Sequence, residues 1–95
     1  MAKPMKFRKK PVVIEALQFD GTAASIEDVM RFLDVAIIVP QEDFLSGDIA
    51  LPIVTLEGTM LCNVGDWIIR GVAGEFYPCK DAIFQATYEA VPEEE

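Results

Sequence analysis

The sequence predicts an α+β domain in which a single, mainly antiparallel sheet packs against one helix. Residues 12–19 alternate apolar and polar side chains and are rich in β-branched residues, as in a half-buried strand. Apolar residues with the i, i+3, i+4, i+7 spacing of one buried helix face follow, namely Ile26, Val29, Met30 and Leu33. Two turn signals, Glu57-Gly58 and the stretch from Gly71 to Gly74, separate short apolar runs and predict tight hairpins.

The first half of the chain divides into four segments. Residues 12–19 form a strand, and a helix covers about residues 25–33 with Ser25 as its N-cap. Residues 36–39 form a short buried strand that ends at a proline. Residues 40–48 form an exposed acidic loop that carries two large apolar residues at its tip, Phe44 and Leu45.

The second half is predicted to be a β-meander over about residues 51–79, followed by a short C-terminal helix that starts near Asp81. On that helix Phe84 and Tyr88 lie one turn apart. The core is expected to contain the apolar side chains of the inner faces: Ile14 or Val13, Leu17, Ile26, Met30, Leu33, Ile38, Trp67, Ile69 and Phe84.

With 95 residues, of which 52% are apolar, the chain is predicted to be one folded domain spanning residues 1–95. Residues 1–8 form a basic N-terminal arm, and residues 92–95 form a frayed acidic tail. The apolar content of so short a chain leaves surface to cover, so we expect a homo-oligomer, at least a dimer. Because no apolar run is long enough to span a bilayer or resembles a signal peptide, we expect a cytoplasmic protein without a membrane partner.

Charge is distributed unevenly along the chain. Five of the eight basic side chains lie in residues 3–10, and all sixteen acidic side chains lie outside that stretch. An acidic body repels phosphate, so nucleic acid is not expected as a partner. The basic arm suits either of two roles: contact with a phosphate-bearing ligand or an acidic partner, or protection of an edge strand by Lys9 and Lys10.

The residues of common catalytic and metal centres are missing from the sequence. The chain has no histidine, which excludes an imidazole base and the Ser-His-Asp and Cys-His nucleophiles. It has no phosphate-binding loop and no dinucleotide fingerprint. Cys62 and Cys79 are seventeen positions apart, a spacing that fits no zinc site and leaves open whether they form a disulfide. We therefore expect no catalytic residues, no metal, no cofactor and no enzymatic activity.

Two stretches of the chain resemble a known family. The opening FRKKPVVIEA, residues 7–16, and the block GDWIIRGVAGEFYPCKDAIFQATYE, residues 65–89, are similar to small uncharacterised proteins of tailed phages and prophages. They are also similar to the domain named for a Pro-Gly-Asp-Tyr-Gly motif, although Val64 and Trp67 stand where that motif has proline and tyrosine. The resemblance implies a phage or prophage origin and a shared fold, and it implies no established activity.

The block from Gly65 to Lys80 contains the candidate ligand site. With alternating side chains in its two strands, Arg70 and Tyr77 are expected on one face, and the core takes Trp67, Ile69 and Phe76. An arginine beside an aromatic ring suits a planar anion such as a nucleotide. Further positive charge would come from the other candidate residues, Lys80, Arg8, Lys9 and Lys10. The alternative is a structural ion pair between Arg70 and Glu75.

The expected function is that of a non-enzymatic phage or prophage accessory protein in the host cytoplasm, which binds and sequesters a small anionic, nucleotide-like signal of host defence. Ligand pockets often form at subunit boundaries, which suits an oligomer. Two alternatives stay open: an inhibitor that binds a host protein through its acidic surface, and a virion or assembly component.

Overall fold

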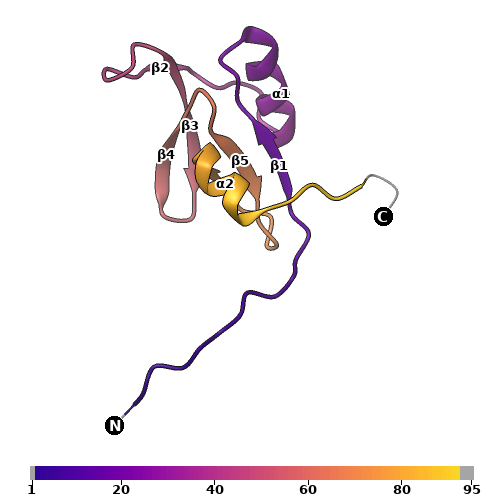
Figure 1. The fold of residues 1–95 in the computed structure, drawn as a ribbon. Coiled ribbons are helices and arrows are strands. Elements are labelled where there is room, and N and C mark those ends of the chain that lie inside the picture. The colour runs from indigo at the N-terminus through magenta and orange to yellow at the C-terminus, as the bar shows by residue number, and fades with distance from the viewer. Residues whose placement is uncertain (1, 93–95) are drawn as a thin grey trace.

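The computed structural model describes residues 2–92 and contains two helices and two antiparallel sheets (Figure 1). This confirms the α+β class, but the expectation of a single sheet is wrong. The elements in chain order are β1 (Glu15–Gln18), α1 (Ala23–Leu33), β2 (Gln41–Glu42), β3 (Ile49–Thr55), β4 (Gly58–Asn63), β5 (Trp67–Arg70), β6 (Phe76–Cys79) and α2 (Asp81–Thr87).

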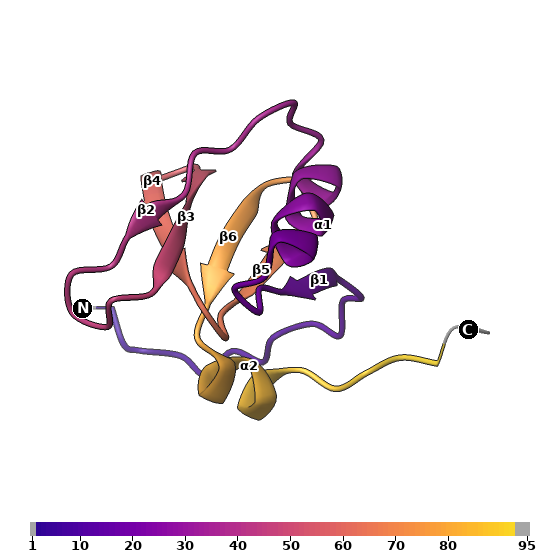
Figure 2. The same ribbon diagram turned by 90° about the horizontal axis from the view of Figure 1, so that it is seen from above.

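Each sheet has three strands. The first has the strand order β1-β5-β6 and the second has the order β2-β3-β4, with every neighbouring pair antiparallel. Seen from above, the sheets meet where β6 lies beside β3 and β4, α1 lies beside β1 and β5, and α2 lies below (Figure 2). The four outer strands of this arrangement are β1, β2, β4 and β6, whose outer backbone edges have no neighbour in their own sheets.

The predicted meander is divided between the two sheets at the turn after β4. Gly65 has a φ of 94°, a left-handed conformation that favours glycine, and it directs the chain away from β4. The Gly65 amide donates to the Phe19 carbonyl at 2.7 Å, and the Phe19 amide donates to the Asp66 carbonyl at 3.0 Å. Because these bonds join the turn to the end of β1, the next strand, β5, pairs with β1 and leaves β4 at an edge.

The two hairpins themselves lie where the turn signals predict them. In the first, Leu56 and Glu57 connect β3 to β4, and Gly58 has a positive φ of 108°. The connection is therefore one residue earlier than the expected Glu57-Gly58. In the second, the turn from Gly71 to Gly74 is closed by a hydrogen bond of 2.7 Å from the Gly71 amide to the Glu75 carbonyl.

The first strand is shorter than the predicted residues 12–19. The last residue of β5, Arg70, pairs with Glu15, so β5 offers no further partner to residues 12–14. Val12 and Val13 are accordingly exposed, by 47% and 75%. β-Branched composition indicated a strand there, but a strand also needs a neighbour that supplies hydrogen bonds.

Helix α1 begins two residues earlier than predicted, because its N-cap is Thr22 and not Ser25. The Thr22 hydroxyl accepts from the Ser25 amide at 3.1 Å, while the Ser25 hydroxyl accepts from the Asp20 amide at 3.0 Å. The carboxylate of the turn residue Asp20 also accepts a hydrogen bond from the Thr22 amide at 2.9 Å. Ser25 is thus a buried member of this capping network, inside the first helical turn.

The segment after α1 is not a strand. Ile37 and Val39 are exposed by 76% and 66%, and only Ile38 packs against the core. The strand of this region is β2, which lies inside the predicted acidic loop. The tip of that loop is as expected, since Phe44 and Leu45 are exposed by 95% and 99%.

The core lies where α1 and the two sheets meet. Its fully buried side chains are Phe19, Val29, Leu51, Ile53, Cys62 and Ile68. Of the residues expected there, Ile69 is fully buried, Val13 is exposed, and the other eight are half-buried. The expectation was incomplete because it omitted β3, which supplies two core residues once the second sheet packs on the first.

The C-terminal helix is confirmed as a short element that packs through aromatic rings. The Phe84 ring stacks on Trp67 with centroids 4.1 Å apart, and the Tyr88 ring lies 5.1 Å from Phe84. The Trp67 indole nitrogen donates to the Asp81 carboxylate at 2.8 Å. Trp67 is therefore half-buried against α2 and is not part of the main core. Of the predicted frayed tail, residues 93–95 lie outside the described residues.

Candidate functional site

Arg70, the central residue of the predicted ligand site, is held by contacts within the fold. Its Nη1 lies 3.0 Å from Glu15 Oε1, and its Nη2 donates to the Phe32 carbonyl at 3.0 Å. The guanidinium also lies 5.1 Å from the Phe32 ring centroid and 5.2 Å from that of Phe76. The alternative of a structural ion pair is correct in kind, but the partner is Glu15 on β1 and not Glu75. Arg70 thus connects β1, β6 and the end of α1.

Arg70 and Tyr77 lie on opposite faces of their sheet, so the expected shared face is wrong. In the β5–β6 pairing Arg70 is opposite Phe76, and Ile69 is opposite Tyr77. Directly opposed residues of an antiparallel pair point to the same side. The sequence analysis treated the two strands separately, and only the pairing register relates the faces of one strand to those of the other.

Tyr77 instead lies near Tyr88 and, through it, near the base of the arm. Burial, a hydrogen bond with Tyr88 and the charge of Glu75 raise the pKa of Tyr77 to about 12. The Lys9 ammonium donates to the Tyr88 hydroxyl at 3.3 Å and lies 4.9 Å from its ring centroid. Two of the predicted site residues, Lys9 and Tyr77, therefore lie beside Tyr88. Arg8 and Lys10 are exposed.

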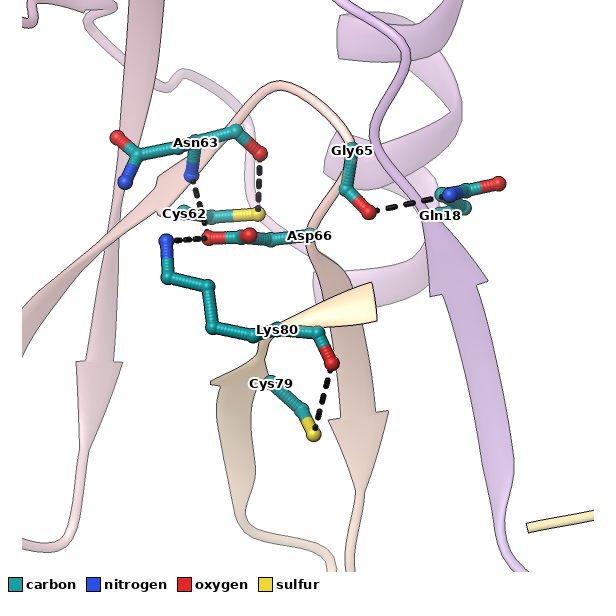
Figure 3. A network of polar contacts seen from close by, with 7 residues as sticks. All are labelled: Gln18, Cys62, Asn63, Gly65, Asp66, Cys79 and Lys80. Carbon is teal, nitrogen blue, oxygen red and sulfur yellow. Dashed lines mark hydrogen bonds and ion pairs between the residues drawn. The ribbon is translucent and has the colours of Figure 1, made fainter. Parts of the chain in front are cut away.

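Lys80 belongs to a polar network around the Gly65-Asp66 turn (Figure 3). Its ammonium lies 3.0 Å from Oδ2 of Asp66, which is 5% exposed and also accepts from the Asn63 amide at 2.9 Å. With the Asn63 side-chain amide oriented to suit its neighbours, its oxygen accepts from Lys80 at 3.0 Å and its nitrogen donates to Asp43 at 3.2 Å. The Lys80 charge therefore balances a buried carboxylate.

Both cysteines are free thiols, which answers the question left open by their spacing. Burial, followed by the nearby Asp66 carboxylate, raises the pKa of Cys62 to about 12, and the same two causes raise the pKa of Cys79. Cys62 Sγ lies 3.9 Å from the Asn63 carbonyl oxygen, and Cys79 Sγ lies 3.6 Å from that of Lys80 (Figure 3). Since the thiolate is the reactive form, neither cysteine has the properties of a nucleophile at neutral pH.

A cleft of about 400 Å³ opens between the β3–β4 turn and β6. It is lined by Thr55, Leu56, Glu57, Met60, Glu75, Phe76, Tyr77 and Pro78. Two of these residues are carboxylates and none is basic, so we call this site the acidic cleft. Its apolar lining is accessible, since Leu56 is 84% exposed and Met60 is 44% exposed.

The acidic cleft is the site that the sequence analysis missed. Tyr77 was a candidate residue, but it was paired with a cation that lies on the other face of the sheet. The flanks of the Glu57-Gly58 turn, Leu56 and Met60, carried a signal in being large apolar residues at an exposed hairpin end. Their position opposite Phe76 depends on the packing of one sheet against the other, which residue order along the chain does not specify.

Two further features concern residues 2–92. No helix in this range has the length and apolar character needed to cross a bilayer. The same range holds no group of three or more side chains that would form a metal site.

No protein-family profile, no curated protein and no solved structure matches this chain. Its function is therefore inferred from its own residues.

Proposed function

We propose that the protein is a non-enzymatic binding protein whose partner is an extended protein segment carrying apolar and basic side chains. The observation that supports this most is the acidic cleft, in which exposed Leu56 and Met60 adjoin two carboxylates. Accessible apolar surface supplies affinity through burial, and carboxylates at its rim favour a cationic partner and its correct register. This is the inhibitor-type alternative of the sequence analysis, now with a defined site.

A small anionic ligand has less support. Arg70 is bound to Glu15, Lys80 balances Asp66, and the lining of the acidic cleft has two negative charges and no positive one. Such a surface repels phosphate. One observation favours the nucleotide-like ligand, namely Lys9 beside the Tyr88 ring, where a planar anion would find a cation and an aromatic face. Sequestration of such a ligand stays a prediction.

The absence of enzymatic activity is part of the proposal. The raised pKa values of Cys62 and Cys79 disfavour thiol chemistry. Asp66 and Glu75 have structural partners: Asp66 accepts from the Lys80 ammonium, and Glu75 accepts from the Ala73 amide, each at 3.0 Å. These contacts indicate that both carboxylates stabilise the turns on which they lie.

The resemblance to phage and prophage proteins supports a partner from a bacterial host. A phage accessory protein acts on host components, so the segment would belong to a host protein in the cytoplasm. No observation favours the alternative of a virion or assembly component.

Fluorescence anisotropy with labelled synthetic peptides tests the proposal. We expect binding of a peptide that alternates apolar and basic residues, weaker binding at higher salt, and no binding of a matched peptide with glutamate at the basic positions. Leu56→Ser should lower the affinity about tenfold, which corresponds to the loss of one buried leucine contact.

The matched control is Val72→Ser. Val72 is also highly exposed, at 74%, but does not line the cleft. Equal effects of the two substitutions, or equal binding of the two peptides, would overturn the proposal. If calorimetry detects a nucleotide or cyclic dinucleotide as the ligand and no peptide binds, the small-ligand prediction is the correct one.

A further inference from the structure

The N-terminal arm is exposed along residues 2–8, and the adjoining Lys9 contacts Tyr88 of the body. It contains no helix or strand and extends away from the body (Figure 1). The radius of gyration, 15.4 Å, reflects this extension, because a compact domain of this length has a value of about 12 Å. Met5 and Phe7 on the arm are exposed by 74% and 88%. Two large apolar side chains on a projecting segment favour its burial against another surface.

The arm has the alternation of a strand with two chemically different sides. In an extended backbone successive side chains point to opposite sides. Met5 and Phe7 therefore share one side, and Lys6 and Arg8 share the other. The apolar side of the arm is therefore suited to packing against an apolar surface, and the other side carries two cations that can pair with carboxylates beside that surface.

The acidic cleft has the complementary features. It offers the apolar side chains of Leu56, Met60 and Phe76 together with the carboxylates of Glu57 and Glu75. It also lies between two sheet edges, because β4 and β6 are each the last strand of their sheet. Exposed strand edges bind extended segments through backbone hydrogen bonds, and the neighbouring pockets select the side chains.

We propose that two copies of this chain exchange arms, so that residues 3–8 of each copy occupy the acidic cleft of the other. This inference rests on the proposed function in using the same cleft, and it makes the arm a competitor of the partner segment. The exchange is isologous, because each copy contributes one arm and one cleft.

The position of the arm favours a second copy over the chain's own cleft, because the arm extends away from the body (Figure 1). Lys9 is bound to Tyr88, which fixes the base of the arm, and no arm residue lines the cleft. Residues 3–8 can span about 20 Å when extended. Outside residues 3–10 the chain has three basic and sixteen acidic side chains, so the basic arm of one copy is attracted to the acidic body of another.

Sedimentation velocity on the full chain and on single variants is the first test. The full chain should sediment as a dimer, with twice the monomer mass of 10.5 kDa. Deletion of residues 2–8, which retains Lys9, and Leu56→Ser in the cleft should each give a monomer. Val72→Ser should stay dimeric. The deleted and substituted groups are exposed, so both variants should stay folded and unfold in a single cooperative transition.

Mixing the two monomeric variants tests the exchange directly. The arm-deleted copy retains a cleft and the Leu56→Ser copy retains an arm, so together they should form a 1:1 complex. This complex has one arm–cleft contact where the full dimer has two, so it should form at a higher concentration. Dimers that persist after arm deletion, or a mixture that stays monomeric, would overturn the arm exchange.

Peptide binding by the arm-deleted chain separates this inference from the proposed function. If arms compete with a partner segment, the arm-deleted chain should bind the apolar and basic test peptide at least tenfold more tightly than the full chain. A monomeric full chain that binds the peptide would refute the arm exchange alone. The opposite result is a dimer that depends on the arm, together with an arm-deleted chain that binds a peptide of residues 2–10 and no other peptide. That result would refute the external partner alone.

Discussion

The two hairpins of this protein differ in how their faces are covered. In β5–β6 both faces are buried: Ile68 points into the core and Ile69 points toward the other side, and both are 0% exposed. In β3–β4 the inner face carries the buried Leu51 and Ile53, whereas the outer face is buried at Ala50 but exposed near the hairpin turn, where Val54 is 78% exposed. The β5–β6 hairpin thus belongs to the packed interior, whereas the β3–β4 hairpin supplies an accessible surface.

The coverage of β5–β6 has two sources. The core covers one face, and α2 covers the other through the stack of Trp67 on Phe84. Within residues 2–92 no helix lies over the outer face of β3–β4 (Figure 2). A pattern of large aromatic and apolar residues therefore indicates packing more readily than it indicates a ligand site.

The largest expected effect tests this difference in burial. Ile68→Ala should lower the free energy of unfolding by about 2–5 kcal/mol, because it removes buried methyl and methylene groups and leaves a cavity. Val54→Ala, on the exposed face of β3, should change it by less than about 0.5 kcal/mol. Urea denaturation measures both. Comparable losses would show that the two hairpins are equally buried in solution.

Arg70→Ala tests whether this side chain belongs to the fold. We expect a loss of about 1–3 kcal/mol, since the substitution removes the hydrogen bonds to Glu15 and Phe32 and the packing against two phenyl rings. The control is Arg31→Ala, which removes an exposed pair with Asp28 and should cost at most about 1 kcal/mol. If Arg70→Ala leaves the free energy of unfolding unchanged, Arg70 is again a candidate ligand-binding residue.

Alkaline pH probes one titrating group with a raised pKa in each hairpin. Burial holds the pKa of Cys62 on β4 and that of Tyr77 on β6 at about 12, above the ordinary values of 9.0 and 10.0. The unfolded chain therefore releases these protons first, and the free energy of unfolding should fall as the pH rises from about 9 to 12. Denaturation curves across this range measure the slope.

Single substitutions measure how much Cys62 and Tyr77 each contribute to this pH dependence of the free energy of unfolding. Cys62→Ala should flatten it from pH 9 upward, and Tyr77→Phe should flatten it only above pH 10, because those are the values at which the unfolded groups begin to ionise. A slope that neither substitution alters would contradict the raised pKa values of both groups.

The smallest expected effect concerns the base of the arm, where Lys9 contacts Tyr88, whose ring lies against Phe84 of α2. Lys9→Ala removes the contact with Tyr88 and should lower the free energy of unfolding by about 0.5–1 kcal/mol. Lys10→Ala, at an exposed neighbouring position, should leave it unchanged within about 0.5 kcal/mol. Thermal melts at low salt compare them. Equal values would mean that Lys9 does not fix the base of the arm.

The sequence by itself determined the α+β class, the presence of α1 and α2, and the places of both hairpins. These features follow from local rules: helical spacing from Ile26 to Leu33, turn-forming glycines, and alternation along each strand. It also determined the opposite charges of arm and body. The two-sheet arrangement was decided by tertiary structure, because hydrogen bonds from the Gly65-Asp66 turn to Phe19 join β5 to β1.

The candidate site shows the same division. Sequence identified Arg70, Tyr77 and Lys80 as distinctive side chains, but their partners depend on strand register and on contacts between distant segments. Register placed Tyr77 on the face opposite Arg70, and folding brought Asp66 to Lys80. The acidic cleft exists only because the end of the β3–β4 hairpin packs beside β6. Local patterns carry no information on such pairings, since they are selected by the burial of the whole core.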